Sequence, residues 1–217
     1  MIAYTIPSDY CGVLVLQTIR ILASITVIVA PYVMASTANA FDHPKETYIA
    51  TYSVSSPKVD AEMILGSDGK GIALMKMNDT NTKVREFSDY AANIKTTFDD
   101  SRKLALVAKM TEKDGEAYDM DRFKRNAIKE LGDKVIEEHP CKGYIYEYNG
   151  YTGEVRIGED CKLIVFSEVV TKDGKTTVTL KKIEQKPAAE EFKYEIPAEY
   201  KVISEKETVQ KTTGEQK

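Results

Sequence analysis

The sequence predicts an α+β fold in which a curved antiparallel sheet packs against one long amphipathic helix. Three observations predict it. Short segments of alternating apolar and polar residues, separated by turn signals, fill residues 47–110. A helical periodicity follows at 120–138, and alternating segments resume from residue 143. An antiparallel sheet must bury its inner face, and the helix is the element available to cover it.

The first 40 residues predict a secretory signal peptide that is removed after Ala40. They contain a single base, Arg20, followed by an almost wholly apolar run at 21–35 and an Ala-x-Ala motif that ends at Ala40. This order is typical of export signals and predicts a periplasmic or secreted protein. The alternative is that residues 12–35 remain as a membrane anchor, although Arg20 would interrupt the roughly 20 apolar residues that a spanning helix needs.

The remaining chain predicts one domain at 41–203 and a polar, disordered tail at 204–217. The whole chain of 217 residues has a net charge of −4. This mild acidity gives no electrostatic reason to bind nucleic acid or an anionic membrane. Membrane contact is therefore expected only through the signal segment or transiently.

The strands of the first half follow from alternation and turn chemistry. Strands are expected at 47–54, 59–65, 72–77 and 84–90. A further strand at 104–110 follows a short strand and a polar turn at 99–102. The turn at 66–71 reads GSDGKG, in which glycine supplies positive φ angles. Turn signals at this spacing are typical of short antiparallel strands.

The helix is expected from about Met120 to Glu138. Its apolar stripe is Phe123, Ala127, Leu131 and Val135, at steps of four residues. Charged residues fill the other face, and Pro140 ends the helix. The ordinary role of such a stripe is packing on a sheet.

Two hairpins are expected after the helix, and the first carries both cysteines that follow the signal segment. With a turn at 149–153, Tyr144 pairs with Gly158 and Cys141 lies opposite Cys161. Opposed strand residues bring their Cβ atoms close enough for a disulfide. We therefore predict a Cys141–Cys161 bond, with two free thiols, or other partners for each, as the alternative. The alternating tyrosines at 144–148 indicate aromatic packing or a binding platform.

No sequence motif indicates catalysis or a resident metal. His43 and His139 lie outside any nucleophile, acid–base or zinc pattern. Two cysteines without a second pair of cysteines or histidines do not make a tetrahedral zinc set. We expect a protein without enzymatic activity or a cofactor, and carboxylates brought together by the fold are the remaining route to catalysis.

The C-terminal segment carries a family resemblance. A strand at 177–184, a loop from Pro187 to Phe192 and the segment YEIPAEY at 194–200 follow one another. This layout resembles the LolA/LolB-like lipoprotein-carrier superfamily, closest to uncharacterised secreted bacterial members with an F-E-I-P-x-G-Y segment, although Glu199 replaces the usual Gly. The segment is expected to act as a closing latch, with Tyr194, Ile196 and Tyr200 buried against the sheet edge or helix.

The resemblance implies an incomplete barrel that wraps the helix and leaves an apolar cavity for acyl chains. It implies a periplasmic carrier of a lipid or a lipoprotein acyl chain that uses no cofactor. Candidate cavity-lining residues are Met63, Leu65, Met75, Phe123, Ala127, Leu131 and Val135. The alternative is an envelope structural or interaction protein with a filled core that meets a protein partner. A cavity of a few hundred Å³ between sheet and helix, on the scale of known ligand sites, would favour the carrier.

Overall fold

The computed structural model describes residues 44–79, 83–111, 114, 119–148 and 150–204. The predicted signal peptide and cleavage site lie outside these residues, as does the tail at 205–217, whereas Ser204 is the last residue of a strand. Within the described part of the chain, no helix is long and apolar enough to cross a membrane.

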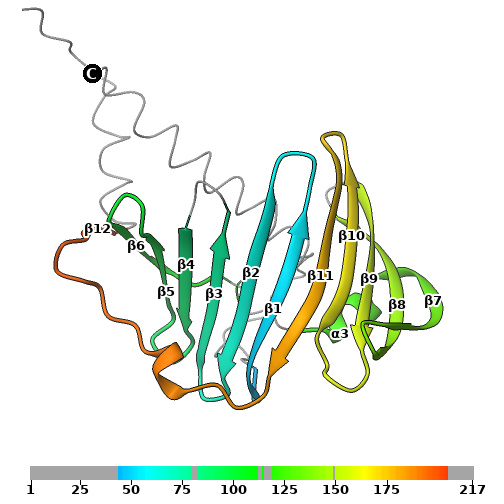
Figure 1. The fold of residues 1–217 in the computed structure, drawn as a ribbon, viewed down its shortest axis with the longest axis horizontal. Helices are drawn as coiled ribbons and strands as arrows, with labels where there is room; N and C mark the ends of the chain where they lie inside the picture. The colour runs from blue at the N-terminus through cyan, green and yellow to red at the C-terminus, as the bar shows by residue number, and fades with distance from the viewer. Residues whose placement is uncertain (1–43, 80–82, 112–113, 115–118, 149, 205–217) are drawn as a thin grey trace, which may run out of the picture.

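In the described part of the chain, one twelve-stranded sheet forms the body of the molecule (Figure 1). The strands are β1 (Thr47–Ser55), β2 (Asp60–Asp68), β3 (Ile72–Asn78), β4 (Lys83–Asp89), β5 (Ile94–Asp99), β6 (Leu104–Lys109), β7 (Ala127–Ile136), β8 (His139–Tyr148), β9 (Tyr151–Gly158), β10 (Ile164–Thr171), β11 (Gly174–Glu184) and β12 (Lys201–Ser204). Their spatial order is β12-β6-β5-β4-β3-β2-β1-β11-β10-β9-β8-β7. Neighbours are antiparallel except for β12, which pairs with β6 in parallel.

The predicted long helix is wrong, and with it the α+β architecture. Residues 127–136 form the edge strand β7, and only Asp121–Arg125 form a helix, α3. A step of four residues keeps side chains on one face of a regular strand as well as of a helix, so the spacing alone does not separate the two structures. In β7 the stripe does not keep one face, because the pairing is irregular between Ala127 and Lys129 and between Leu131 and Lys134. The deciding feature is the turn after β7, where Glu137 and Glu138 have φ angles of 48° and 71°. Two consecutive positive φ angles are typical of a tight hairpin turn.

The predicted register of the β8–β9 hairpin is also wrong. Cys141 pairs with Gly158 and Tyr144 with Val155. The turn lies between Tyr148 and Tyr151, which pair with each other, rather than across 149–153. The shorter turn moves every pair of the hairpin by three residues relative to the sequence-based alignment.

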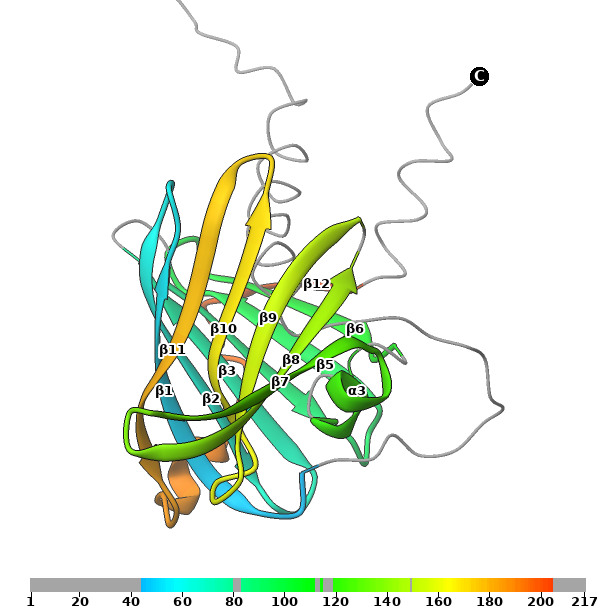
Figure 2. The same ribbon diagram turned by 90° about the vertical axis from the view of Figure 1, so that its right-hand side faces the viewer.

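The sheet is strongly curved, and α3 lies on its concave side (Figure 2). The concave core takes buried residues of β1, β2, β3 and β8–β11, together with Phe123 of α3. Phe123 contacts the ring of Tyr146 edge-on, with ring centroids 5.4 Å apart. The alternation of buried and exposed residues along β1 is the pattern expected of a strand with one buried face.

The convex face has a smaller core of its own. It consists of Leu74, Phe87, Phe98, Ala105, Phe192 and Tyr200. Phe192 ends the short 3-10 helix η1 (Ala189–Phe192), which packs outside β2 and β3. Beyond η1 the chain runs along the convex face and pairs β12 with β6 at the sheet edge.

Candidate functional site

The concave face is crossed by an apolar row that spans five neighbouring strands. Leu180 of β11 pairs with Tyr52 of β1, Tyr52 with Met63, Met63 with Met77, and Met77 with Val84 of β4. Each side chain is at most 4% exposed. Paired residues share a face of the sheet, so these five positions form one continuous apolar band.

The neighbouring row changes from apolar to polar along its length. Leu65 pairs with Met75, Met75 with Glu86, and Glu86 with Thr97. Leu65 and Met75 are half-buried, whereas the adjacent band is buried. The half-buried pair therefore offers apolar surface at the border of the packed core.

A charged cluster ends this row on the concave side of β4 and β5. The Thr97 hydroxyl donates a hydrogen bond to Glu86 Oε2 at 3.0 Å, and Lys95 Nζ lies 2.5 Å from Asp114 Oδ1. Burial raises the pKa of Glu86, although the Lys95 ammonium and the Thr97 hydroxyl act against it. Burial opposes ionisation of Asp114, but the Lys95 ammonium and hydrogen bonds from Thr111 outweigh it and lower its pKa.

The phenols of the concave face are held in their neutral form. Burial raises the pKa of Tyr48, Tyr52 and Tyr90, so none of them supplies a phenolate near neutral pH. Tyr90 donates a hydrogen bond to the Asp114 carbonyl oxygen at 3.3 Å. These side chains therefore contribute aromatic surface and hydrogen bonds.

The structure brings five of the seven predicted cavity-lining residues to the concave face. Met63 and Phe123 are buried in its core, and Leu65 and Ala127 pack against that core. Met75 shares the face through its pairing with Leu65.

The other two predicted lining residues lie elsewhere. Leu131 pairs with Gly143 and so faces away from Tyr144, which belongs to the concave core. Val135 is 67% exposed on the edge strand. Both were selected from the helical stripe, which does not form.

Both cysteines of the domain are free thiols in the structure. Cys141 is buried and Cys161 is half-buried, and burial raises the pKa of each thiol. Cys161 Sγ occupies the space where a side chain on Gly158 would begin, and Gly158 pairs with Cys141. The two thiols thus share one side of the hairpin, and the disulfide stays a prediction.

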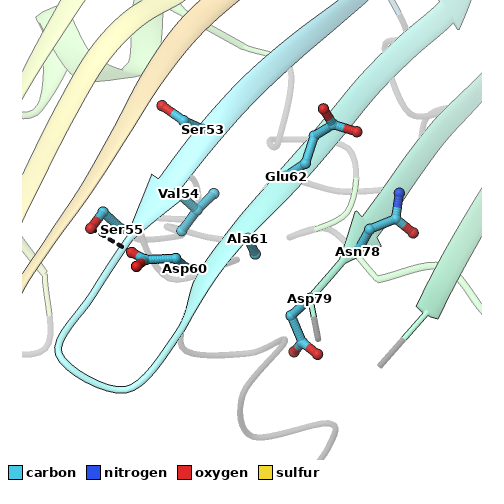
Figure 3. A pocket seen from close by; sticks show the side chains of 8 residues that line it. All are labelled: Ser53, Val54, Ser55, Asp60, Ala61, Glu62, Asn78 and Asp79. Carbon is cyan, nitrogen blue, oxygen red and sulfur yellow. Dashed lines mark hydrogen bonds between the residues drawn. The ribbon is translucent and has the colours of Figure 1, made fainter. Parts of the chain in front are cut away.

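A separate hollow lies where β1, β2 and β3 meet at one end of the sheet. Its volume is about 590 Å³, and Figure 3 shows the side chains that line it. It is lined by Ser53, Val54, Ser55, Asp60, Ala61, Glu62, Asn78 and Asp79. Three carboxylates line it, and Ser55 donates a hydrogen bond to Asp60 at 2.7 Å. Its position, at the ends of β1, β2 and β3, differs from that of the apolar cavity predicted between sheet and helix.

The sequence reasoning missed the charged cluster and the neighbours of Cys161. Glu86 stands between Val84 and Ser88, both of which are buried, so the alternation along β4 was a usable signal. Asp160 and Cys161 are adjacent in the chain, but nothing comparable in the sequence links His139 to them. Their approach depends on the hairpin register and on a loop conformation.

No model of a known protein family matches the chain, and no curated protein matches it. Among solved structures, an uncharacterized conserved protein from Thermus thermophilus matches with a TM-score of 0.55 and 8% identity, over 74% of this chain and 91% of that one. The MucA/MucB complex of Pseudomonas aeruginosa matches with a TM-score of 0.47 and 11% identity, over 73% of this chain and 58% of that one. Lipoprotein LppX of Mycobacterium tuberculosis matches with a TM-score of 0.38 and 11% identity, over 66% of this chain and 88% of that one. The Thermus likeness shows a shared fold only, and the lower-scoring likenesses are too distant to show more.

Proposed function

We propose that this is a secreted or periplasmic binding protein, without enzymatic activity, that carries a lipid or a lipoprotein acyl chain. The observation that carries the proposal is the apolar concave face, with the half-buried pair Leu65 and Met75 beside the buried band. The resemblance of the C-terminal segment to lipoprotein carriers and the export signal predicted for residues 1–40 support the same function.

The composition of the face suits a flexible apolar ligand. Methionine has an unbranched, polarizable side chain that adapts to irregular apolar shapes, and Met63, Met75 and Met77 lie together on β2 and β3. Each methylene group removed from water contributes about 0.8 kcal/mol, so a long acyl chain can offset the cost of ordering it. The cluster of Glu86 and Lys95 marks where such a chain has to end.

The titratable groups of this face support binding rather than catalysis. Lys95 and Asp114 are engaged with each other, and the buried tyrosines stay protonated. A catalytic base needs a partner whose proton it takes at hydrogen-bond distance. Glu86 accepts a hydrogen bond from the Thr97 hydroxyl, so its carboxylate is also engaged within the cluster.

A pair of tryptophan variants on adjacent residues of β2 tests the proposal. Leu65→Trp fills the concave surface beside Met75, whereas Ile64→Trp adds the same side chain on the opposite face, where Ile64 is also half-buried. A fluorescent fatty acid is titrated into wild type and both variants. We expect saturable binding by wild type and Ile64→Trp, and about tenfold weaker binding by Leu65→Trp, equivalent to about two lost methylene contacts.

The burial of the apolar band favours a second candidate, an interaction protein with a filled core. Side chains at most 4% exposed leave little room for a ligand unless the core opens. This function predicts that wild type does not bind the fatty acid saturably. Native mass spectrometry of protein purified from its own envelope separates the two, because a carrier retains lipid and the interaction protein retains a polypeptide.

A further inference from the structure

Three metal-ligating side chains converge on the side of the molecule where β8 begins. His139 opens β8, and Asp160 and Cys161 lie in the loop between β9 and β10. One imidazole nitrogen, one carboxylate oxygen and the thiol sulfur all lie within 4.8 Å of one another. His139 Nδ1 is 2.7 Å from Asp160 Oδ2.

Backbone hydrogen bonds hold these residues in place. The β9–β10 loop is closed on itself by the bonds from Gly158 N to Leu163 O at 2.9 Å and from Lys162 N to Gly158 O at 3.0 Å. Glu159 N donates to Pro140 O at 2.8 Å, which ties the loop to the residue after His139. The three side chains are therefore presented by two anchored segments.

We propose that His139, Asp160 and Cys161 bind one zinc ion or a similar transition-metal ion. Imidazole nitrogen, carboxylate oxygen and thiolate sulfur are the zinc ligands of proteins, and sulfur and imidazole disfavour magnesium and calcium. Tetrahedral zinc places its ligands about 3.3–3.6 Å apart, so small movements within the cluster admit the ion. The His139 side chain is 23% exposed and that of Asp160 48%, so the ion reaches the site from solvent.

Three protein ligands leave a fourth position for water or an external ligand, the arrangement found at open zinc sites. Cys141 is the nearby thiol outside the set, and its Sγ donates to the His139 carbonyl oxygen at 3.3 Å. A Cys141–Cys161 disulfide would consume the thiolate that the metal needs. The metal site and the disulfide predicted from the sequence therefore exclude each other.

The test uses full-length protein carrying Cys141→Ser, which keeps the three ligands and prevents the disulfide. The reduced, chelator-treated variant is titrated with Co²⁺, which reports thiolate coordination by charge-transfer absorption and tetrahedral geometry by its visible bands. Zn²⁺ should then displace Co²⁺ at one ion per chain. We expect the separate additional changes His139→Gln, Asp160→Asn and Cys161→Ser each to weaken binding at least tenfold, with Cys161→Ser also abolishing the charge-transfer band.

Glu159→Gln is the matched control. Glu159 is an acid in the same loop that pairs with Lys142 at 3.1 Å and lies outside the cluster, so this change should alter affinity less than twofold. Reduced wild type should give the same cobalt spectrum, which guards against misfolding of the Cys141 variant. The proposal is overturned by a missing charge-transfer band in both proteins, or by binding that survives Cys161→Ser. A quantitative Cys141–Cys161 bond in protein isolated under alkylation from its own host would overturn it as well.

Discussion

The convex face of the sheet is closed by aromatic side chains from one distant segment, whereas the concave face is closed mainly by rows of side chains from the strands. On the convex side, Tyr194 stacks on Phe87 with ring centroids 4.9 Å apart, and Tyr200 meets Phe98 edge-on at 5.9 Å. The Tyr200 hydroxyl also donates to Asp100 at 2.6 Å. Each contact has a defined partner and geometry.

The concave face joins an apolar band to a charged cluster at its border. Its apolar band continues into the half-buried pair Leu65 and Met75 and then into Glu86, Lys95 and Asp114. Charges at the border of a core lower stability unless they are paired. The comparison teaches that the chain completes its convex face with its own C-terminal segment, whereas the half-buried methionine and leucine and the charged cluster of the concave face are not covered by that segment.

The largest expected effect comes from removing an aromatic ring that packs on the convex face. Phe98 is fully buried between Tyr200 and the guanidinium group of Arg85, whose central carbon lies 4.3 Å from the ring centroid. We expect Phe98→Ala to lower the free energy of unfolding by about 3–5 kcal/mol, since it leaves a cavity among fixed neighbours. Met63→Leu on the concave face should cost less than about 1.5 kcal/mol.

Urea unfolding of the two variants measures both values. A cost for Phe98→Ala below about 1.5 kcal/mol would contradict the view that Phe98 packs among fixed neighbours.

The convex latch shows how much of the fold the sequence predicts. The segment at 194–200 was interpreted as an apolar closure, and Tyr194 and Tyr200 do pack on the sheet, although on its outer face. Ile196 was expected to be buried and is 36% exposed. The first-half strands follow alternation and turn residues closely, because local chemistry determines both. The face on which a returning segment packs depends on contacts far apart in the sequence.

The second half shows why other parts escape prediction. Helix and regular-strand periodicities coincide at steps of four, so the spacing of Ala127, Leu131 and Val135 does not separate a helix from a strand. The irregular pairing of β7, which puts Ala127 and Leu131 on different faces, is not visible in that spacing. The hairpin turn needs positive φ angles at Glu137 and Glu138. Neither residue is a glycine, so the sequence does not mark this turn. For the site, Met63, Leu65 and Met75 were predictable from alternation along β2 and β3. The approach of His139 to Cys161 was not, because the hairpin register decides it.

A smaller effect tests the polar contact of the latch. Tyr200→Phe keeps the ring on Phe98 but removes the hydroxyl that donates to Asp100. Hydrogen bonds to charged groups contribute about 1.5–3 kcal/mol when buried, and the Asp100 side chain is 33% exposed, so we expect a loss of about 1–2 kcal/mol. Because Arg85 also contacts Asp100 at 3.1 Å, a double-mutant cycle with Asp100→Ala isolates the pair. A coupling energy near zero would mean that ring packing alone holds the latch.

The smallest effect concerns the charged border of the concave face, where the pKa values of two carboxyl groups shift in opposite directions. Burial raises the pKa of Glu86, whereas Lys95 and Thr111 lower that of Asp114 despite burial. An acid with a raised folded-state pKa lowers stability as the pH rises from its unfolded-state pKa through its folded-state pKa. An acid with a lowered folded-state pKa stabilises above its unfolded-state pKa, and this contribution is lost as the pH falls through the folded-state pKa.

Glu86→Gln should therefore stabilise the protein at neutral pH, by about 1 kcal/mol or less, because it removes an ionised group whose burial is unfavourable. The amide keeps an oxygen that can accept the Thr97 hydrogen bond, so the change acts mainly on charge. The gain should vanish below the ordinary glutamate pKa of about 4.3, where both folded and unfolded wild type carry the proton. Asp114→Asn is the matched contrast and should destabilise at neutral pH, with a cost that shrinks in acid. Unfolding curves across this pH range measure both variants. A Glu86→Gln variant that is less stable than wild type at neutral pH would show that Lys95 uses the Glu86 charge, and would place that carboxylate among the groups that hold the concave face together.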